Sequence, residues 1–332
     1  MKLSILDQVP IPSGASAKSA LDSSIQLAIE AEKLGYHRYW VAEHHNLTGL
    51  ACPNPDVMLG IIGSKTNTIR IGAGAVLLPH YKPYKVVETY HLLATLYPGR
   101  VDLGIGRAPG GSAETSIALS GNFLEQVRMM PEKLDEVMRF IEQSFPEDHL
   151  FHSVIPTPVP SVAPAVWLLG TSEKSSKTAA EKGMNYAFGH FMTEKDGPTI
   201  MKEYRDQMQQ LHPNKQAESI VAISVICAET KEAAEELAMS TIFRRIQETK
   251  GIRRDGVPSL EEVKQYTFTD EDREIIEKTK QKMILGNPLQ VREQLKSLQA
   301  SYKVDELMIV TITHDPQARL RSYQLIAEAF SF

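Results

Sequence analysis

Two apolar segments joined by a helix, between positions 69 and 111, place the strongest limit on the fold of this chain. Residues 69–78 read IRIGAGAVLL, a run too apolar to leave one face in water, so it fits a strand covered on both sides. Helical periodicity follows over Tyr84–Leu96, Pro98 and Gly99 end it, and a second apolar strand begins at once over Val101–Gly106. Because buried parallel strands need helical crossovers, this unit predicts a parallel α/β fold.

Both strands of this unit contain glycine at alternate positions. Gly72 and Gly74 lie in the first strand, and Gly104 and Gly106 lie in the second. Strands usually avoid glycine because it has no side chain to pack, so these positions indicate either relief of crowding inside a barrel or close approach of a ligand. Arg107 follows at the carboxyl end of the second strand, where α/β folds bind anions, and this favours the ligand interpretation.

The alternation of strands and helices continues along the chain. About eight strand–helix units, without a second repeat family, predict a TIM (β/α)8 barrel that forms a single domain over residues 1–332. Two segments interrupt the pattern. The proline-rich stretch 145–164 is predicted to be a surface loop, and the charged insertion 249–285 is either a solvated surface segment or a mobile lid over the site. The remaining strands are predicted at 2–8, 38–42, 165–170, 185–189, 220–228 and 305–313.

Composition and charge exclude several classes of protein. The chain has 36 Lys and Arg residues against 41 Asp and Glu residues, a net charge of −5 with no basic tract, so nucleic-acid binding is disfavoured. Asp7 and Pro10 come too early for a signal peptide and no apolar run of about 18 residues occurs, so we expect a cytoplasmic protein without a membrane segment. Cys52 and Cys227 lack motif spacing, so neither a disulfide framework nor a metal site is expected.

Glu43, His44 and His45 follow the predicted strand at 38–42 directly. The carboxyl ends of the strands carry the active site in a parallel barrel, so these side chains are candidates for chemistry. Adjacent residues of a regular strand point to opposite faces. One histidine is therefore a candidate acid or base, and the other is a candidate structural hydrogen-bonding residue.

The segment from Gly170 to Ser176 follows another buried strand and begins a helix. It carries four hydroxyl groups, including those of Ser172 and Ser175, and hydroxyls with free backbone N–H groups at a helix N-terminus favour a phosphate dianion. The alternative is an ordinary N-cap, where Ser and Thr are preferred whatever the function. Arg107 could add charge to the same anion. These residues describe a flavin mononucleotide site as well as a sugar-phosphate enzyme, whereas no glycine fingerprint of a Rossmann dinucleotide site occurs.

Four segments of the chain closely resemble the bacterial luciferase-like monooxygenases, in particular their non-luminescent group. The resemblance implies a TIM barrel, usually a homodimer, with the helices at 57–65 and 84–96 as the expected interface. It also implies that reduced FMN comes from a separate NAD(P)H:flavin reductase, that O2 is activated at the flavin, and that a small organic substrate is oxidised. The segments are RYWVAEHHN at 38–46, IRIGAGAVLLPHY at 69–81, LYPGRVDLGIGRAPG at 96–110 and LLGTSEKSSKTAAEKG at 168–183.

The same resemblance implies roles for individual residues. His44 corresponds to the family's active-site histidine, which assists the oxygen chemistry or deprotonates the substrate. Gly74 and Ala75, with Ala73 before them, correspond to a bulge beneath the flavin ring, where the peptide bond is often cis. The other cofactor-binding positions implied are the phosphate-binding residues Arg107, Ser172, Ser175 and Ser176, with Gly170 before them, and His190 in the flavin pocket.

Two other functions stay open at this point. A deazaflavin-dependent dehydrogenase on the same fold would transfer hydride without O2, and a non-catalytic flavin-binding protein would bind FMN without forming a product. The substrate is not identified, because the loops that set specificity on this fold, such as 110–122 and the insertion 249–285, differ most between its enzymes.

Overall fold

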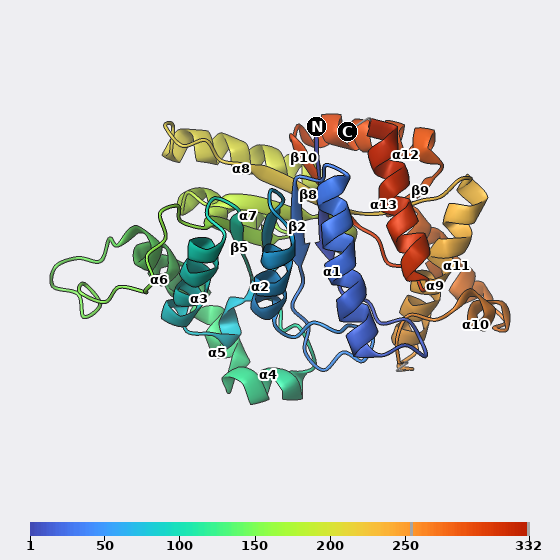
Figure 1. Ribbon diagram of the computed structural model, residues 1–332, viewed down its shortest axis with the longest axis horizontal. Coiled ribbons are helices and arrows are strands. Elements are labelled where there is room, and N and C mark those ends of the chain that lie inside the picture. The colour runs from blue at the N-terminus through green and yellow to red at the C-terminus, as the bar shows by residue number, and fades with distance from the viewer. Residues whose placement is uncertain (253–254, 331–332) are drawn as a thin grey trace.

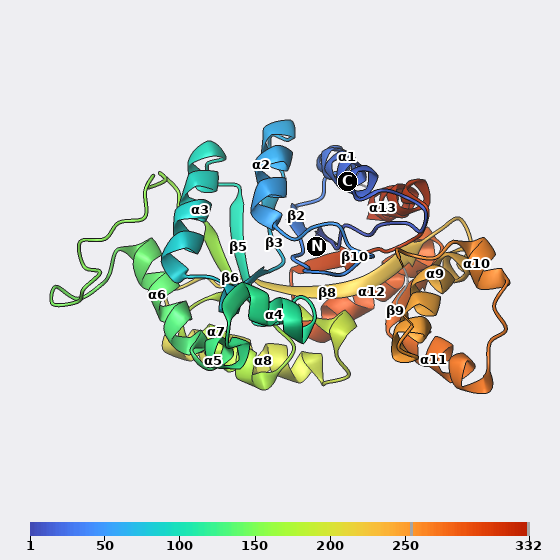
Figure 2. The same ribbon diagram turned by 90° about the horizontal axis from the view of Figure 1, so that it is seen from below.

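The computed structural model describes residues 1–252 and 255–330, and within them eight parallel strands close into a barrel surrounded by helices (Figures 1 and 2). This confirms the predicted TIM-barrel fold class. Positions 331 and 332 of the expected domain, and positions 253 and 254 of the expected insertion, lie outside the described residues. The barrel strands, in their order around it, are β1 (Lys2–Asp7), β2 (Arg38–Val41), β3 (Arg70–Ala73), β5 (Val101–Gly106), β6 (Ala165–Gly170), β7 (Asn185–Gly189), β8 (Ser219–Cys227) and β10 (Glu306–Val310).

Helices cover the outside of the barrel because each carries an apolar face toward the strands, and the largest buried cluster lies in this layer. The connection after β5 holds three helices: α4 (Ala113–Ser120), α5 (Phe123–Arg128) and α6 (Met130–Glu142). The proline-rich segment 145–164 is a projecting loop, as predicted (Figure 2). The other covering helices are α1 (Ala17–Lys33), α2 (Pro55–Lys65), α3 (Pro83–Leu96), α7 (Glu173–Glu181), α8 (Gly197–Leu211), α12 (Pro288–Tyr302) and α13 (Pro316–Phe330).

A second apolar cluster fills the inside of the barrel, around the edge-to-face pair of Trp40 and Trp167. This cluster explains two of the strand glycines. A Cβ atom at Gly72 would lie 2.7 Å from Nε1 of Trp40, and one at Gly74 would lie 2.5 Å from Leu6. Relief of crowding is therefore the reason for glycine at these two positions. A ligand close to the side-chain face of these residues is not needed to explain them.

The segment between β8 and α12, which contains the predicted insertion 249–285 and the helix before it, folds as a small unit beside the barrel and is called the insertion from here on (Figure 2). Its helices are α9 (Lys231–Thr249), α10 (Leu260–Lys264) and α11 (Asp270–Lys280), and its strand β9 (Met283–Gly286) pairs with the end of β8. Apolar residues of α9 pack on β8 and β9 in a third buried cluster, and Lys250 forms an ion pair with the buried Asp272. The segment predicted at 249–285 thus packs on α9 and β8 through a shared apolar cluster, and its movement as a lid stays a prediction.

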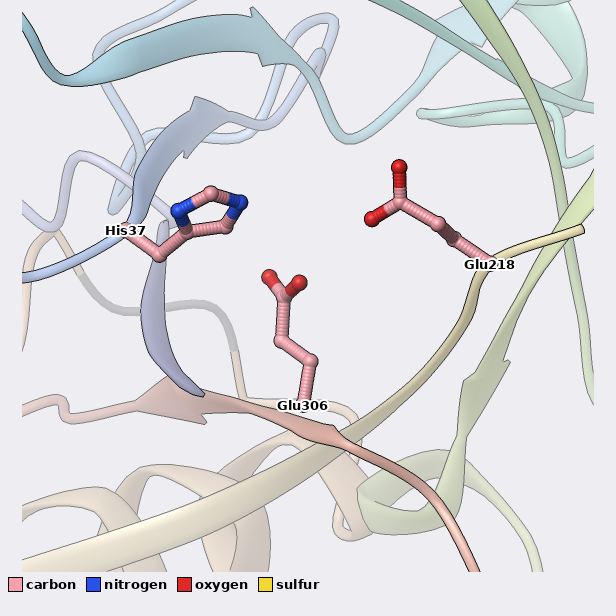
Figure 3. A group of neighbouring side chains, drawn as sticks. All are labelled: His37, Glu218 and Glu306. Atoms are coloured by element: carbon pink, nitrogen blue, oxygen red, sulfur yellow. The ribbon is translucent and has the colours of Figure 1, made fainter. Parts of the chain in front are cut away.

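The amino end of the barrel is closed by the buried guanidinium of Arg38. It donates to Glu306 over 2.6 Å, to Asp102 over 2.9 Å and to Glu218 over 2.8 Å, and it lies over the ring of Trp167. His37, Glu218 and Glu306 bring potential metal-ligand atoms within 4.8 Å of one another (Figure 3). Because both carboxylates are already bonded to Arg38, this cluster is best explained as part of the ion-pair network.

Replacement of Arg38 by methionine should destabilise the protein strongly. The change leaves Asp102 and Glu306 buried without their cation, and removal of one partner from a buried ion pair costs about 3–5 kcal/mol. Urea unfolding measures the free energy of unfolding, with Lys18→Ala as a control that removes an exposed ion pair and should change it little. Equal stability of the Arg38→Met variant and the wild type would refute this account.

Candidate active site

The segment after β3 forms the bulge expected from the sequence. The Gly74–Ala75 peptide is cis, as anticipated, and the short strand β4 (Val76–Leu77) follows it. Both β3 and β4 pair with β5, so residues 73–75 lie at the carboxyl end of the barrel between two pairings with the same strand. Gly104 in β5 permits this arrangement, because a Cβ atom there would lie 2.1 Å from the carbonyl oxygen of Ala73.

A buried carboxylate, that of Glu43, connects the end of β2 to this bulge. Its Oε1 accepts a hydrogen bond from Tyr81 over 2.7 Å and lies 2.7 Å from Nε2 of His45, while its Oε2 accepts from the backbone N–H of Leu77. The backbone N–H of His45 also donates to Gly110 over 2.8 Å. His45 is thus the structural histidine of the pair. Glu43 was among the candidates named from the sequence, whereas Tyr81 is a site residue that the sequence reasoning missed.

His44 is placed differently from its neighbour. Its backbone N–H donates to Cys52, and within the described residues its buried Nδ1 has no hydrogen-bond partner. Burial, and to a smaller extent the charges of Arg244 and His45, lowers the pKa of His44 to about 4. At neutral pH the imidazole is therefore uncharged and has an uncommitted ring nitrogen, which is the state required of a proton acceptor.

The N-terminus of α7 brings several of the predicted phosphate-binding residues together. Ser172 and Ser175 form a reciprocal capping box, and the Ser175 hydroxyl lies 2.9 Å from that of Tyr186 in β7. Gly170 allows this approach, because a Cβ atom there would lie 2.2 Å from Oγ of Ser175. Burial raises the pKa of Tyr186 to about 12, against the hydrogen bonds of Ser175 and Ser172 and the charge of Arg107. The exposed Arg107 directly follows β5, the strand next to β6, which leads into α7.

Two predicted residues make other contacts in the structure. The hydroxyl of Ser176 is buried and donates to the carbonyl oxygen of Glu173, and its N–H donates to Ser172, so both polar groups are used inside α7. His190 follows β7, where its Nδ1 lies 2.6 Å from the hydroxyl of Tyr302. The capping box also accounts for the Ser172 and Ser175 hydroxyls, so capacity for an anion resides mainly in Arg107 and in the first-turn N–H groups of α7.

The family model for luciferase-like monooxygenases matches residues 1–303. The chain belongs to this family. It is 40% identical to the uncharacterized protein YceB of Bacillus subtilis over 328 residues, which cover 99% of each chain. It is 37% identical to the N-acetyl-S-alkylcysteine monooxygenase of Bacillus subtilis over 332 residues, covering 99% of this chain and 98% of the relative. The solved structure of apo-MsnO8 matches with a TM-score of 0.89 and 32% identity, covering 99% and 98% of the two chains.

A large cavity of this luciferase-like family member lies apart from the predicted site residues. Its volume is about 570 Å³, and it is bounded by the loop after β1, the helices α9 and α10, and the start of α13. The polar residues that line the cavity are Ser13, Ser19, Ser23, Ser240, Glu261, Thr313, His314, Asp315 and Arg319.

Among the described residues, no helix combines the length and the apolar character needed to cross a membrane.

The free energy of unfolding should depend on pH through His44. Below pH 6.5 the unfolded chain takes up a proton at this residue, whereas the folded chain does so only near pH 4. Stability therefore falls as the pH is lowered through this window, by up to about 3 kcal/mol for this group. Urea unfolding at pH 7, 5.5 and 4 should show a smaller loss for His44→Gln than for the wild type, and parallel pH dependences of the two proteins would contradict the burial of a neutral imidazole.

Proposed function

We propose that this protein is a flavin-dependent monooxygenase, which uses reduced FMN and O2 to oxidise a small organic substrate. The observation that carries the proposal is the placement of three features at the carboxyl ends of β2, β3, β5 and β6. They are the neutral His44 with its uncommitted Nδ1, the bulge at 73–75, and the cationic N-terminus of α7 with Arg107. Bound reduced flavin would supply the electrons for the reduction of O2.

The phosphate group of the flavin would be held by the chain at α7. The first-turn N–H groups point toward the helix end, and the guanidinium of Arg107 adds a full positive charge. The backbone of Ala73, Gly74 and Ala75, which carries at most a methyl group, would support the flat ring system.

His44 would hold or move a proton during the reaction. A neutral imidazole can accept a proton at Nδ1 from the substrate and return it later. Glu43 would hold His44 and the bulge in position relative to each other. Its carboxylate contacts His45, the residue after His44, and accepts a hydrogen bond from the N–H of Leu77, in β4 beyond the bulge. In this proposal His44 is the catalytic residue and Glu43 positions the two parts of the site relative to each other.

The choice of substrate to test first comes from one relative. The Bacillus subtilis protein named for N-acetyl-S-alkylcysteine oxidation is 37% identical over nearly the whole chain. We therefore propose thioether compounds of this class as the first substrates to assay. The alternatives are a deazaflavin-dependent dehydrogenase, which would turn over without O2, and a non-catalytic flavin-binding protein, which would form no product.

Flavin binding is the first measurement that tests the proposal. Reduced FMN should bind more tightly than oxidised FMN or a deazaflavin, and Arg107→Ala should raise the dissociation constant of reduced FMN at least about tenfold, since tenfold corresponds to 1.4 kcal/mol. Arg273→Ala, which removes an exposed arginine of α11, is the matched control. His44→Ala should abolish product formation and leave flavin affinity unchanged.

The outcomes of this experiment separate the proposed roles. Absence of binding of any flavin by the wild-type protein would refute the function. Loss of flavin affinity together with turnover in His44→Ala would make His44 a structural residue. Turnover that continues without O2 would favour the dehydrogenase, and tight binding of FMN with no product from any thioether tested would favour the non-catalytic alternative.

We also propose that the protein is a cytoplasmic homodimer that receives its flavin from a separate NAD(P)H:flavin reductase. Large apolar side chains of the expected interface helices are exposed: Val57 and Ile61 on α2, and Leu92 and Leu96 on α3, with exposed fractions of 62%, 39%, 49% and 58%. Exposed apolar side chains on two helices that contact each other support an interface with a second copy.

Sedimentation velocity tests the dimer directly. The wild type should sediment as a dimer, and the double variant Ile61→Glu, Leu92→Glu should sediment as a monomer because like charges then meet across the symmetry axis. Leu211→Glu, at an exposed apolar residue of α8, is the control that should stay dimeric. A monomeric wild type would refute the proposed assembly.

A further inference from the structure

One face of helix α9 lies over the carboxyl end of the barrel. The hydroxyl of Thr241 donates to the carbonyl oxygen of Ile312, just beyond β10. One turn later, Arg244 lies against Gly49, since a Cβ atom built on Gly49 would be 3.0 Å from Nη1 and 3.1 Å from Cζ of the guanidinium. Gly49 belongs to the same loop as His44, so Arg244 stands at the edge of the candidate active site.

The guanidinium of Arg244 is only partly neutralised. Its Nε donates to Glu248 over 2.8 Å, but the Glu248 side chain is 57% exposed, whereas that of Arg244 is 19% exposed. Within residues 1–252 and 255–330, no carboxylate other than that of Glu248 forms an ion pair with Arg244, and the hydrogen bond to Glu248 comes from Nε. The acidic residue of the site, Glu43, is already bonded to His45, Tyr81 and Leu77. The charge of Arg244 acts on His44 directly, since it lowers the pKa of His44 together with the larger effect of burial.

We propose that Arg244 binds a carboxylate group of the substrate and thereby holds the reacting part of that molecule beside His44. This inference rests on the proposed function, because it takes His44 as the centre of the reaction. The two free amino groups of a guanidinium match the two oxygens of a carboxylate and can bind them in parallel. The ion pair would lie at a partly buried position, where it is worth more than on an open surface.

The flavin phosphate is not the anion that Arg244 serves. The phosphate cluster follows β5 and β6. Arg244, a residue of α9, packs against the loop after β2, and α9 also contacts the chain just beyond β10. In the barrel order β10, β1, β2, β3, β5, β6, these positions belong to different sides of the mouth. Two separate anionic groups, one on the cofactor and one on the substrate, satisfy the two cationic positions.

Two probes that differ only in charge test the proposal. N-acetyl-S-benzylcysteine carries the carboxylate, and its primary amide is the neutral counterpart. Titration calorimetry with FMN-saturated and with flavin-free protein should show that the wild type binds the carboxylate at least about tenfold more tightly than the amide. Arg244→Met should reduce this preference to less than about twofold without weakening the binding of the amide. Arg244→Lys keeps the charge but lacks the two parallel amino groups of a guanidinium, so its preference should be intermediate.

Arg245→Met is the matched control, because it removes the exposed arginine next along α9. It should keep the preference for the carboxylate. The proposal is overturned if the wild type shows no preference, if Arg244→Met weakens both probes equally, or if Arg245→Met has as large an effect. Flavin affinity is measured on the same samples. A wild type that binds no flavin but prefers the carboxylate through Arg244 would refute the proposed function and support the anion site.

Discussion

The fully buried guanidinium of Arg38 is the interaction on which the barrel depends most directly. It joins β2 to Asp102 of β5, to Glu306 of β10 and to Glu218 before β8, so strands far apart in the sequence meet at one charge. In a TIM barrel the amino end serves stability and the carboxyl end serves chemistry. The network at the amino end leaves the opposite end free to hold an imidazole whose buried Nδ1 has no hydrogen-bond partner among the described residues, which a less stable scaffold would not tolerate.

Strand β2 connects these two ends within four residues, Arg38–Val41. Just beyond its carboxyl end, the buried carboxylate of Glu43 accepts hydrogen bonds from the hydroxyl of Tyr81 and the N–H of Leu77 and lies beside the ring of His45. A cation at one end of the strand and an anion at the other thus fix the barrel and the bulge. His44 lies between these anchored neighbours, and its orientation follows from them.

The fold could be predicted from the sequence because long apolar runs and helical periodicity are local signals. Strand β9 was missed because Met283–Gly286 offers only three apolar residues after a charged helix. Contacts of the site were harder to predict. His190 and Tyr302 are separated by 112 positions. A sequence does not show whether a core tyrosine uses its hydroxyl for a hydrogen bond or contributes only its ring to the packing. Ser176 was implied by the family resemblance, although its spacing to Ala179 and Ala180 already indicated the buried face of α7.

Helix α9 belongs to two environments at once. Ile242 and Ile246 lie in the core of the insertion, and Arg244, between them in sequence, reaches the loop of His44. A change in the insertion core would therefore shift or turn this helix and move the guanidinium, with no substitution in the barrel itself. Under the proposed function, selectivity would then change through residues that never contact a substrate, while the proposed phosphate-binding cluster at α7 stays the same.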